Sequence, residues 1–378
     1  MRKRLNIITS VPLSEPVVSN RLFPFFDALA KKDITVRCIC PASDFDHTLL
    51  PAHVVLDEVD VRLTKPGGFI KRGIREAWDV TTLLRYARGQ HGRTTLVTIP
   101  SMFLAFLTPL LLRRHQVFID VRDLTWEYLP DSRLCYRWAK NTFRWLFKKN
   151  INSFKLIAAT NNTELRYIQA LKPRIAPLHI SNGIRQSQFD KLKQVDVSTE
   201  TVFTVTYIGN VGLAQRLDTL VEAARALPDI AFRIIGTGID KSRIRHLVAE
   251  YQLSNVLLTG RLPWDEVIHH YNASHVLYAQ LAPEFSGAMP SKLYEYLATG
   301  KPIIYGGQGQ ALETLQQFES CYVIEPCQPD QLIPQLEALS DSLDTSYLSQ
   351  RNKHRIKGNF IREEVALRLA HEIRGHMT

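Results

Sequence analysis

The segment PSKLYEYLATGKPIIYGG, Pro290 to Gly307, contains a lysine and a glutamate about one helical turn apart. The proline favours a helix start, and Gly300 predicts that the helix ends just before it. Lys292 and Glu295 are three residues apart and therefore share one face of that helix. A helix N-terminus with an ammonium group binds phosphate, and a carboxylate one turn along accepts hydrogen bonds from ribose hydroxyls. A surface ion pair of little energetic weight is the alternative.

Two glycine-containing turns follow strand-like runs in the same half of the chain. Gly209 and Gly212 come after TVFTVTYI, and Gly236 and Gly238 come after AFRII. Glycines let the backbone approach a ligand, and the next helix offers free N–H groups to an anion. These turns predict a phosphate or diphosphate site at the carboxyl edge of a sheet. An ordinary tight turn is the alternative for both, and it is the stronger reading for Gly236 and Gly238.

A cluster of charged residues ends a strand-like run in the first half. Asp120, Arg122 and Asp123 lie at the end of QVFIDVRD. Loops at this edge of α/β sheets carry function, which makes the three residues candidates for a site. An Arg–Asp pair that only fixes the end of the strand is the alternative.

Strand-like runs alternate with amphipathic helical patterns along the whole chain. The strand-like runs cover 5–9, 35–40, 95–99, 117–121, 155–160 and 177–180, and then 202–208, 231–235, 255–259, 275–279, 302–305 and 320–324. The helical patterns include 22–30, 216–226, 243–251, 293–299 and a last helix near 360–374. This alternation predicts two doubly wound, Rossmann-like α/β domains with parallel sheets. We place the join near Ser181-Asn182-Gly183 and expect the polar stretch 185–200 to be a linker.

The chain has 378 residues, of which 45% are hydrophobic and 22% are charged. This composition is typical of a soluble globular protein. The five cysteines lack zinc-binding spacing, so we expect reduced thiols. The apolar stretch 96–112 is short and is interrupted by Pro100 and Pro109, which favours a strand, a break and a buried helix over a membrane span. No secretory signal is visible, which predicts a cytoplasmic protein.

Positive charge is concentrated in the first half. Residues 1–185 hold 29 Lys and Arg against 15 Asp and Glu, whereas residues 186–378 hold 18 against 22. A basic stripe at helical spacing lies there, with aromatic residues between its members: Arg133, Arg137, Lys140, Arg144 and Lys148. Such helices bind anionic membrane surfaces, and the solvated face of an ordinary packed helix is the alternative. No recognition motif for nucleic acid accompanies the charge, so we expect none to bind.

Four motifs of the second half resemble a known family when taken together. They are YIGNVGLAQRLDTLVEAA, FRIIGTG, NVLLTGRLPWDEV and PSKLYEYLATGKPIIYG. In this order and spacing they resemble the donor domain of retaining glycosyltransferases of family 4, which have the GT-B fold. The resemblance is closest to the bacterial branch that builds O-antigen and capsular polysaccharides. It is strong over residues 200–310 and looser over the first domain.

The resemblance implies an architecture and an activity. The architecture is two Rossmann-like domains facing across a cleft, with residues 1–183 for the acceptor and 184–358 for a nucleotide-sugar donor. Residues 359–378 would form a C-terminal helix, for which packing back on the first domain is one option. The activity is hexosyl or N-acetylhexosaminyl transfer to a lipid-linked or saccharide acceptor, with retention of configuration and no cofactor or metal. Peripheral attachment to the inner face of the plasma membrane is an option.

The resemblance also implies contacts with the donor. Glu295 matches the second glutamate of the family's EX7E motif, which binds the donor ribose, whereas the first glutamate falls on Gly287. The arginine and lysine that neutralise the diphosphate in many relatives are replaced here by Asn210 and Gln215. The expected donor-binding residues are Gly209, Asn210, Gly212, Arg216, Gly236, Gly238, Arg261, Gly287, Ala288, Met289, Lys292, Leu293 and Glu295.

In relatives the edge that holds Asp123 faces the acceptor and the donor sugar. Asp123 is therefore the candidate to orient or deprotonate the acceptor hydroxyl, and Arg122 the candidate to contact a diphosphate. The family's glycine-rich acceptor loop is replaced here by PLSEPVVSNR, residues 12–21. That replacement makes Glu15, Asn20 and Arg21 the candidate acceptor contacts.

Two other functions remain open at this stage. The same fold also serves nucleotide-sugar epimerases, although the motif set matches transferases better. The substitutions at Gly287, Asn210 and Gln215 favour a non-catalytic nucleotide-sugar-binding or scaffold protein of a polysaccharide assembly complex.

Overall fold

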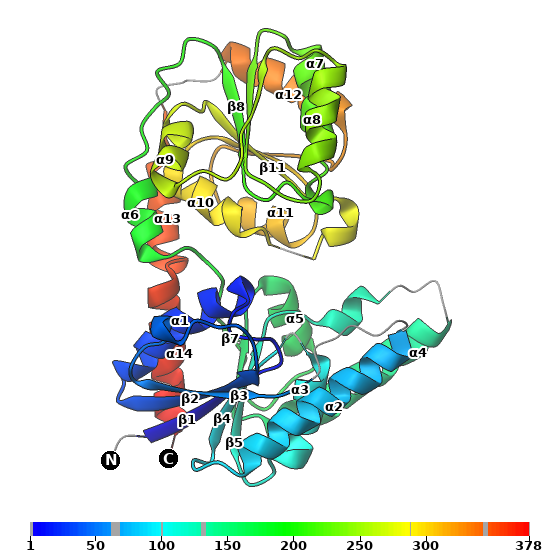
Figure 1. The fold of residues 1–378 in the computed structure, drawn as a ribbon, viewed down its shortest axis with the longest axis vertical. Helices are drawn as coiled ribbons and strands as arrows, with labels where there is room; N and C mark the ends of the chain where they lie inside the picture. The colour runs from blue at the N-terminus through cyan, green and yellow to red at the C-terminus, as the bar shows by residue number, and fades with distance from the viewer. Residues whose placement is uncertain are drawn as a thin grey trace. The chain divides into compact units, whose positions relative to one another are not determined.

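The computed structural model describes residues 3–61, 69–99, 101–129, 134–287, 289–342 and 347–377, without the side chains of residues 69, 70 and 128. The chain divides into two compact units, which are considered separately (Figure 1). Unit 1 comprises Met1–Asn182 and Arg362–Thr378, and unit 2 comprises Gly183–Ile361.

Unit 1 is built on a seven-stranded parallel sheet with the order β3-β2-β1-β4-β5-β6-β7. Its strands are β1 (Lys3–Thr9), β2 (Ile34–Pro41), β3 (Val54–Val59), β4 (Thr94–Ile99), β5 (Gln116–Val121), β6 (Leu156–Ala159) and β7 (Leu178–His179). Its helices are α1 (Pro16–Ala30), α2 (Phe69–Arg88), α3 (Met102–Leu111), α4 (Leu134–Asn150), α5 (Asn162–Ala170) and α14 (Arg362–His376), with short 3₁₀ turns η1 (His47–Leu49), η2 (Thr125–Tyr128) and η3 (Ile151–Ser153).

Unit 2 has a six-stranded parallel sheet with the order β10-β9-β8-β11-β12-β13. Its strands are β8 (Thr204–Ile208), β9 (Ala231–Ile235), β10 (Val256–Leu258), β11 (Val276–Gln280), β12 (Ile303–Gly306) and β13 (Cys321–Ile324). Its helices are α6 (Gln186–Leu192), α7 (Asp218–Ala226), α8 (Lys241–Glu250), α9 (Trp264–Asn272), α10 (Ser291–Thr299), α11 (Gln310–Leu315), α12 (Pro329–Ser342) and α13 (Gln350–Asn359), with 3₁₀ turns η4 (Leu213–Gln215) and η5 (Pro283–Phe285).

Both sheets are buried on both faces. In β1, Leu5 and Ile7 belong to the core that α1 and α14 cover, whereas Ile8 belongs to the core under α2 and α3. In β8, Val205 lies in the core under α7 and Ile208 in the core under α10. Side chains of a strand alternate between faces, so apolar residues on both sides require helices on both sides. The predicted pair of doubly wound α/β domains is confirmed.

The stretch expected to be a linker, residues 185–200, is part of unit 2. It contains α6, and Phe189, Leu192 and Val195 are buried in the core of unit 2. The expectation was wrong because the polar composition masks three apolar residues spaced three apart: Phe189 and Leu192 form the buried face of α6, and Val195 is buried just beyond its end.

The C-terminal helix α14 packs against α1 in unit 1 (Figure 1). Val365, Leu369 and Ile373 are buried in the same core as Leu22 and Phe26 of α1. The chain therefore returns to its first unit after completing the second.

The apolar stretch 96–112 forms the end of β4 and then α3, as expected; Pro100 itself lies outside the described residues. Within the described part of the chain, every helix is too short or too polar to cross a bilayer.

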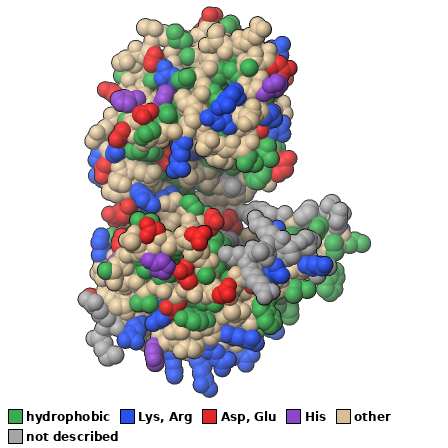
Figure 2. Space-filling view, in the orientation of Figure 1, with side chains coloured by type: hydrophobic (Ala, Val, Ile, Leu, Met, Phe, Trp, Pro, Cys, Tyr) green, Lys and Arg blue, Asp and Glu red, His purple; other side chains and the backbone are tan. Residues whose placement is uncertain are grey.

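The charge difference between the halves of the sequence also separates the two units. Unit 1 holds 31 Lys and Arg against 18 Asp and Glu, and unit 2 holds 16 against 19. Figure 2 shows Lys and Arg side chains gathered at the lower end of unit 1, the end where β1 and β5 begin in Figure 1.

Candidate active site

The ammonium group of Lys292 lies at the carboxyl end of β8. Its Nζ donates a hydrogen bond to the Tyr207 hydroxyl and lies 3.8 Å from the centre of the Tyr207 ring. The Tyr207 hydroxyl donates to the carbonyl oxygen of Asn210 at 2.5 Å. Among the described residues Lys292 forms no ion pair, although the charge of Glu295 acts on it. Burial lowers the pKa of Lys292 to about 7, and Glu295 opposes part of that shift.

Helix α10, which carries Lys292 and Glu295, begins after Pro290 and ends at Gly300, as the sequence predicts. A second tyrosine of the helix fixes it to β8: the amide of Ile208 donates to the Tyr296 hydroxyl at 2.8 Å, and that hydroxyl donates to the carbonyl of Ile208 at 3.1 Å. The helix therefore presents its N-terminus beside the end of the strand, where an anion would meet free N–H groups.

Glu295 lies one turn along α10 and is half-buried. The hydroxyl of Tyr271, from α9, donates to Glu295 Oε2 at 3.4 Å. Burial, followed by the charge of Glu295, raises the pKa of Tyr271 well above its usual value. The tyrosine therefore stays protonated and orients the carboxylate as a hydrogen-bond donor.

The glycine turns after β8 and β9 pack directly against each other. The amide of Gly209 donates to the carbonyl of Ile235 at 2.9 Å. A side-chain carbon at Gly236 would lie 1.8 Å from the carbonyl oxygen of Gly209, and one at Gly238 would lie 2.2 Å from that of Val211. A side-chain carbon at Gly209 would lie 2.8 Å from Lys292 Nζ. Glycine is needed at these positions for close backbone approach and, at Gly209, to leave room for the ammonium group.

The loop after Gly209 is closed by its own side chains. Gln215 Oε1 accepts from the amide of Gly212 at 3.1 Å and from Asn210 Nδ2 at 3.5 Å. Asn210 and Gln215, which stand where many relatives carry arginine and lysine, thus hold the loop together. A side-chain carbon at Gly212 would lie 2.6 Å from Asn210 Nδ2 and 2.8 Å from Gln215 Oε1, so these two amides would have to move apart to admit it.

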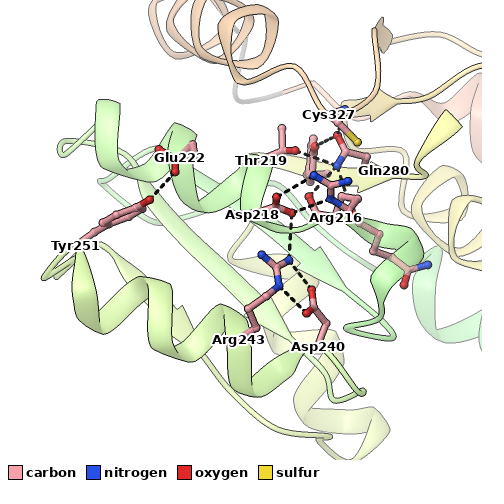
Figure 3. A network of polar contacts seen from close by, with 11 residues as sticks. Arg216, Asp218, Thr219, Glu222, Asp240, Arg243, Tyr251, Gln280 and Cys327 are labelled. Atoms are coloured by element: carbon pink, nitrogen blue, oxygen red, sulfur yellow. Dashed lines mark hydrogen bonds and ion pairs between the residues drawn. The ribbon is translucent and has the colours of Figure 1, made fainter.

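Arg216 belongs to a network of charged residues at the start of α7 and α8 (Figure 3). Its guanidinium donates to both carboxylate oxygens of Asp218, at 3.4 and 3.3 Å. Arg243 bridges Asp218 and Asp240, with distances of 2.7 Å to Asp240. Asp218 raises the pKa of Arg216. The side chain of Arg216 is therefore engaged by a carboxylate, whereas that of Lys292 is not.

Gln280, at the end of β11, also holds the loop that contains Gln215 and Arg216, and it was not predicted as a site residue. Its Nε2 donates to the carbonyls of Gln215 at 3.1 Å and Arg216 at 2.8 Å, and its Oε1 accepts from the amide of Cys327 at 2.9 Å (Figure 3). Gln280 is 1% exposed. A polar residue at the end of a buried strand was the signal that could have identified it.

The remaining predicted donor residues divide into three groups. Arg261 is exposed and makes no hydrogen bond or ion pair with the described residues. Gly287 and Met289 are half-buried on either side of Ala288, which lies outside the described residues. The side chain of Leu293 is fully buried in the core under α10, so it contributes to packing.

In unit 1, Asp120 and Arg21 form an ion pair at the carboxyl edge of the sheet. Arg21 Nη2 lies 2.9 Å from Asp120 Oδ1, with the two side chains 12% and 3% exposed. Arg21 also donates to the carbonyls of Ile180 and Ser181, at 3.1 and 3.2 Å. These contacts connect α1, β5 and the end of β7, which gives Arg21 a positioning role.

Arg122 and Asp123 follow β5 at the same edge. Arg122 is buried, and its Nη2 donates to the carbonyl of Val17 in the first turn of α1 at 2.7 Å. The carboxylate of Asp123 makes no hydrogen bond or ion pair within the described residues. Burial raises the pKa of Asp123, and the nearby charge of Arg122 lowers it by less. A half-buried carboxylate with a raised pKa suits proton transfer.

The other two acceptor candidates lie at the start of α1. Glu15 is exposed and occupies the N-cap position, where its backbone carbonyl accepts from the amides of Val18 and Ser19. Asn20 is half-buried on the same helix. The hydrogen bond from Arg122 to the carbonyl of Val17 therefore lies in the helix turn that follows Glu15.

Among the described residues, no group of three or more His, Cys, Asp or Glu is arranged to hold a metal ion. One Asp-x-Asp pair, Asp44 and Asp46, follows β2. Asp46 accepts hydrogen bonds from the amide and hydroxyl of Thr48 and so caps η1. Capping of η1 therefore explains the role of the Asp46 carboxylate.

One protein-family model matches most of unit 2. Residues 188–355 match the model of the family described as "Glycosyl transferases group 1". This part of unit 2 is therefore similar to a glycosyltransferase group 1 domain. The loops that hold Gly209, Gly236 and Lys292 all fall inside the matched residues. A comparison with curated proteins by sequence finds no match.

Solved structures of glycosyltransferases share the fold of the whole chain. Sucrose-phosphate synthase from Thermosynechococcus elongatus has a TM-score of 0.73 at 17% identity, covering 99% of both chains. HepE from Anabaena, solved with UDP and also with UDP-glucose, has a TM-score of 0.68 for the UDP complex at 13% identity, covering 99% of this chain and 100% of HepE. WaaG, "a glycosyltransferase involved in lipopolysaccharide biosynthesis", has a TM-score of 0.66 at 13% identity, covering 98% and 100%. The predicted GT-B fold is confirmed, and the domain match with the fold likeness supports a GT-B glycosyltransferase.

Three tyrosines that contact the candidate donor site or the strand beside it were not predicted from the sequence. Tyr207 precedes the first glycine turn, Tyr271 lies on α9 and Tyr296 lies on α10. All three are fully buried, and each places its hydroxyl on a site residue or on the backbone of β8. A buried tyrosine needs a hydrogen-bond partner for its hydroxyl. The tyrosines within the motifs YIGN and YEY could therefore have indicated that their hydroxyls bind nearby site residues or the backbone.

Proposed function

We propose that the protein is a glycosyltransferase that moves a hexosyl or N-acetylhexosaminyl group from a nucleotide-sugar donor to a lipid-linked saccharide acceptor in cell-surface polysaccharide synthesis. The observation that carries the proposal is Lys292. Lys292 is half-buried, and its ammonium group has no ion-pair partner among the described residues; it lies at the N-terminus of α10 and against Gly209. A donor diphosphate would supply the missing negative charge.

The likeness to group 1 glycosyltransferases supports a nucleotide-sugar donor in unit 2. Transfer develops negative charge on the leaving diphosphate, which Lys292, the N-terminus of α10 and the backbone N–H groups near Gly209 would stabilise. Glu295, held by Tyr271, would accept hydrogen bonds from the ribose hydroxyls. Neutralisation by these groups requires no metal ion, and retention of configuration is what the family resemblance implies.

The acceptor chemistry is proposed for unit 1. Asp123 would orient or deprotonate the attacking hydroxyl, because its carboxylate is half-buried, has a raised pKa and makes no hydrogen bond within the described residues. Arg122 would tune that carboxylate and contact phosphate, while Glu15 and Asn20 would contact the acceptor. Arg21 would act through Asp120 as a positioning residue.

The direct test is donor binding followed by turnover. UDP-glucose, UDP-N-acetylglucosamine, GDP-mannose and dTDP-glucose are screened for thermal stabilisation, starting from UDP-sugars because HepE was solved with them. The stabilising donor should then be consumed in the presence of lipid-linked saccharides, and excess chelator should leave the rate unchanged. Dependence on a divalent ion would contradict the mechanism. Binding without turnover on any acceptor would favour a non-catalytic nucleotide-sugar-binding protein, which the engaged side chain of Arg216 also favours.

Removing the Glu295 carboxylate should weaken donor binding. Glu295→Ala is expected to raise the Kd of the donor by about 10- to 100-fold, because hydrogen bonds to a charged group contribute on the order of 1.5–3 kcal/mol. Calorimetric titration with nucleotide-sugar measures it. Glu250→Ala, on the exposed end of α8, is the matched control and should bind normally. Near-normal affinity in Glu295→Ala would remove Glu295 from the donor site.

We also propose that α4 meets an anionic membrane surface. Leu134, Trp138 and Trp145 share one face of the helix and are 80%, 78% and 59% exposed. The basic residues Arg137 and Arg144 flank that face, and Arg137, Lys140, Asn141 and Arg144 line a cavity of about 390 Å³. Arg133 of the predicted stripe lies outside the described residues. Exposed tryptophans beside cations suit the headgroup region of a bilayer.

Charge reversal should release the protein from vesicles. Arg137→Glu with Arg144→Glu is expected to lower sedimentation with anionic liposomes by about tenfold or more, since each cation near such a surface contributes about 1 kcal/mol. Trp138→Ser with Trp145→Ser should also lower it while leaving the charge unchanged. Lys172→Glu with Arg174→Glu, exposed residues elsewhere in unit 1, is the control for net charge. Equal sedimentation of all three pairs would assign α4 an ordinary solvated face.

A further inference from the structure

A basic cavity lies at the amino edge of the unit 1 sheet, the edge opposite to Asp123. It has a volume of about 730 Å³ and is lined near the starts of β1, β4, β5 and β6 by Lys3, Arg4, Arg93, Arg113, Arg114 and Lys155. His115 also lines it, and the described lining contains no Asp or Glu. The cluster of Lys and Arg at the lower end of unit 1 in Figure 2 lies at this edge. We call this site the amino-edge cavity.

Helix capping accounts for only one of these cations. Several helices end at this edge, and cations stabilise the carbonyls at helix C-termini. Lys3 does so, because its Nζ donates to the carbonyl of Met377 just beyond α14. The side chains of the other five make no hydrogen bond or ion pair with any residue that the structure describes: Arg4, Arg93, Arg113, Arg114 and Lys155.

The cavity is a region of positive potential. His115 bonds Thr95 through Nδ1 at 3.0 Å, and the charged groups that act on its ring are Arg93 and Arg88. Burial, and then these two arginines, lower the pKa of His115. Unpaired like charges around one space repel each other, and an anion bound among them would relieve that repulsion.

We propose that the amino-edge cavity binds a ligand with two or more phosphate groups. Guanidinium groups bind phosphate through paired hydrogen bonds, and five cations require more negative charge than one phosphate carries. The volume lies within the range of small-molecule pockets, about 300–1,000 Å³. The phosphates belong either to a free polyphosphate-bearing molecule or to lipid headgroups. The site is separate from Lys292, which lies in unit 2.

The test uses inorganic pyrophosphate and the full chain in a Lys292→Met background, so that the donor domain does not contribute. Calorimetry at low ionic strength should show one pyrophosphate per chain. Arg113→Gln with Arg114→Gln, both exposed and in the turn before β5, should bind about tenfold more weakly or worse. Lys172→Gln with Arg174→Gln removes the same charge elsewhere in unit 1 and should bind normally. The imidazole resonance of His115 should report a rise in its pKa as pyrophosphate binds.

Sedimentation with phosphatidate vesicles distinguishes the two sources of phosphate. Pyrophosphate binding that is lost only in the Arg113/Arg114 pair supports a free ligand. Vesicle binding that is lost only in that pair, without binding of pyrophosphate, supports lipid headgroups. Absence of both kinds of binding, or equal losses in the two variant pairs, would overturn the proposal. An unshifted His115 pKa in the presence of both pyrophosphate and vesicles would overturn it without any substitution.

Discussion

Lys292→Met is expected to weaken donor binding by about 100-fold and, at the same time, to raise the thermal stability of the empty protein. The ammonium group contacts Tyr207 and Gly209 and lacks an ion-pair partner among the described residues. Replacing a buried charge by an apolar side chain of similar length stabilises a protein by about 1–3 kcal/mol. Losing its contact with a diphosphate should cost about 100-fold in Kd.

The effect of Lys292 depends on pH in a defined direction. Its pKa is about 7 in the folded protein and 10.5 in an ordinary lysine. Between these values the unfolded chain holds a proton that the folded protein has lost, so the stability of the native chain rises with pH from 7 to about 10. The stability advantage of Lys292→Met should therefore be greatest below pH 7 and shrink above it. Melting curves at pH 6, 7.5 and 9 measure the gap.

Donor affinity should also depend on the protonation of Lys292, but it should fall as the pH rises. A bound diphosphate raises the pKa of Lys292, so binding takes up a proton above pH 7, and affinity should fall by up to about tenfold per pH unit there. Lys292→Met should show a flat profile. Lys301→Met is the matched control: Lys301 donates to the carbonyls of Asn272 and Ser274, so its loss should destabilise the domain. A pH-independent affinity in the native chain would contradict a phosphate contact at Lys292.

The ends of the α10 helix could be predicted from the sequence because local rules determine them. Pro290 and Gly300 mark the two ends, and the structure gives Ser291–Thr299. The contact that makes Lys292 informative joins two residues 85 positions apart, through β8 and α10. No local pattern contains that contact, because it depends on how a helix docks on a sheet.

The missed elements have a different cause. Strand β3 (Val54–Val59) contains Asp57 and Glu58, which break its apolar pattern. It lies at the edge of its sheet, where charged side chains are tolerated, and Asp57 pairs with Arg37 of β2 at 2.5 Å. Helix α6 was hidden by polar residues around Phe189 and Leu192. In both cases composition suggested a loop, and packing against a neighbouring element decided the structure.

The candidate site of unit 1 was predictable in position but not in the roles of its residues. Asp120, Arg122 and Asp123 end β5, as the pattern QVFIDVRD indicates. Side chains two residues apart near a strand end point the same way, and here Asp120 and Arg122 both contact α1, Asp120 through Arg21 and Arg122 through the carbonyl of Val17. The alternative of an Arg–Asp pair that fixes the strand end describes Asp120. Asp123 is then the carboxylate at this strand end that makes no hydrogen bond or ion pair within the described residues.

Asp123→Asn is accordingly expected to lower kcat by about 10²- to 10⁴-fold, the usual contribution of a positioned acid or base. Donor Kd and melting temperature should stay unchanged, because the side chain makes no hydrogen bond within the described residues. The contrasting control is Asp120→Asn, which leaves the buried Arg21 without its ion pair and should lower stability by about 3 kcal/mol. Steady-state rates with the identified donor and thermal melts distinguish the two variants.

The pH profile tests the same assignment independently. Burial raises the pKa of Asp123, so the rate should fall as pH drops through that raised value. Arg122 lowers the pKa of Asp123, and Arg122→Gln should therefore move the acid limb of kcat/KM to higher pH, whereas Arg122→Lys should move it less. A profile that is identical in all three proteins, or full activity in Asp123→Asn, would show that the proton of the acceptor hydroxyl goes elsewhere.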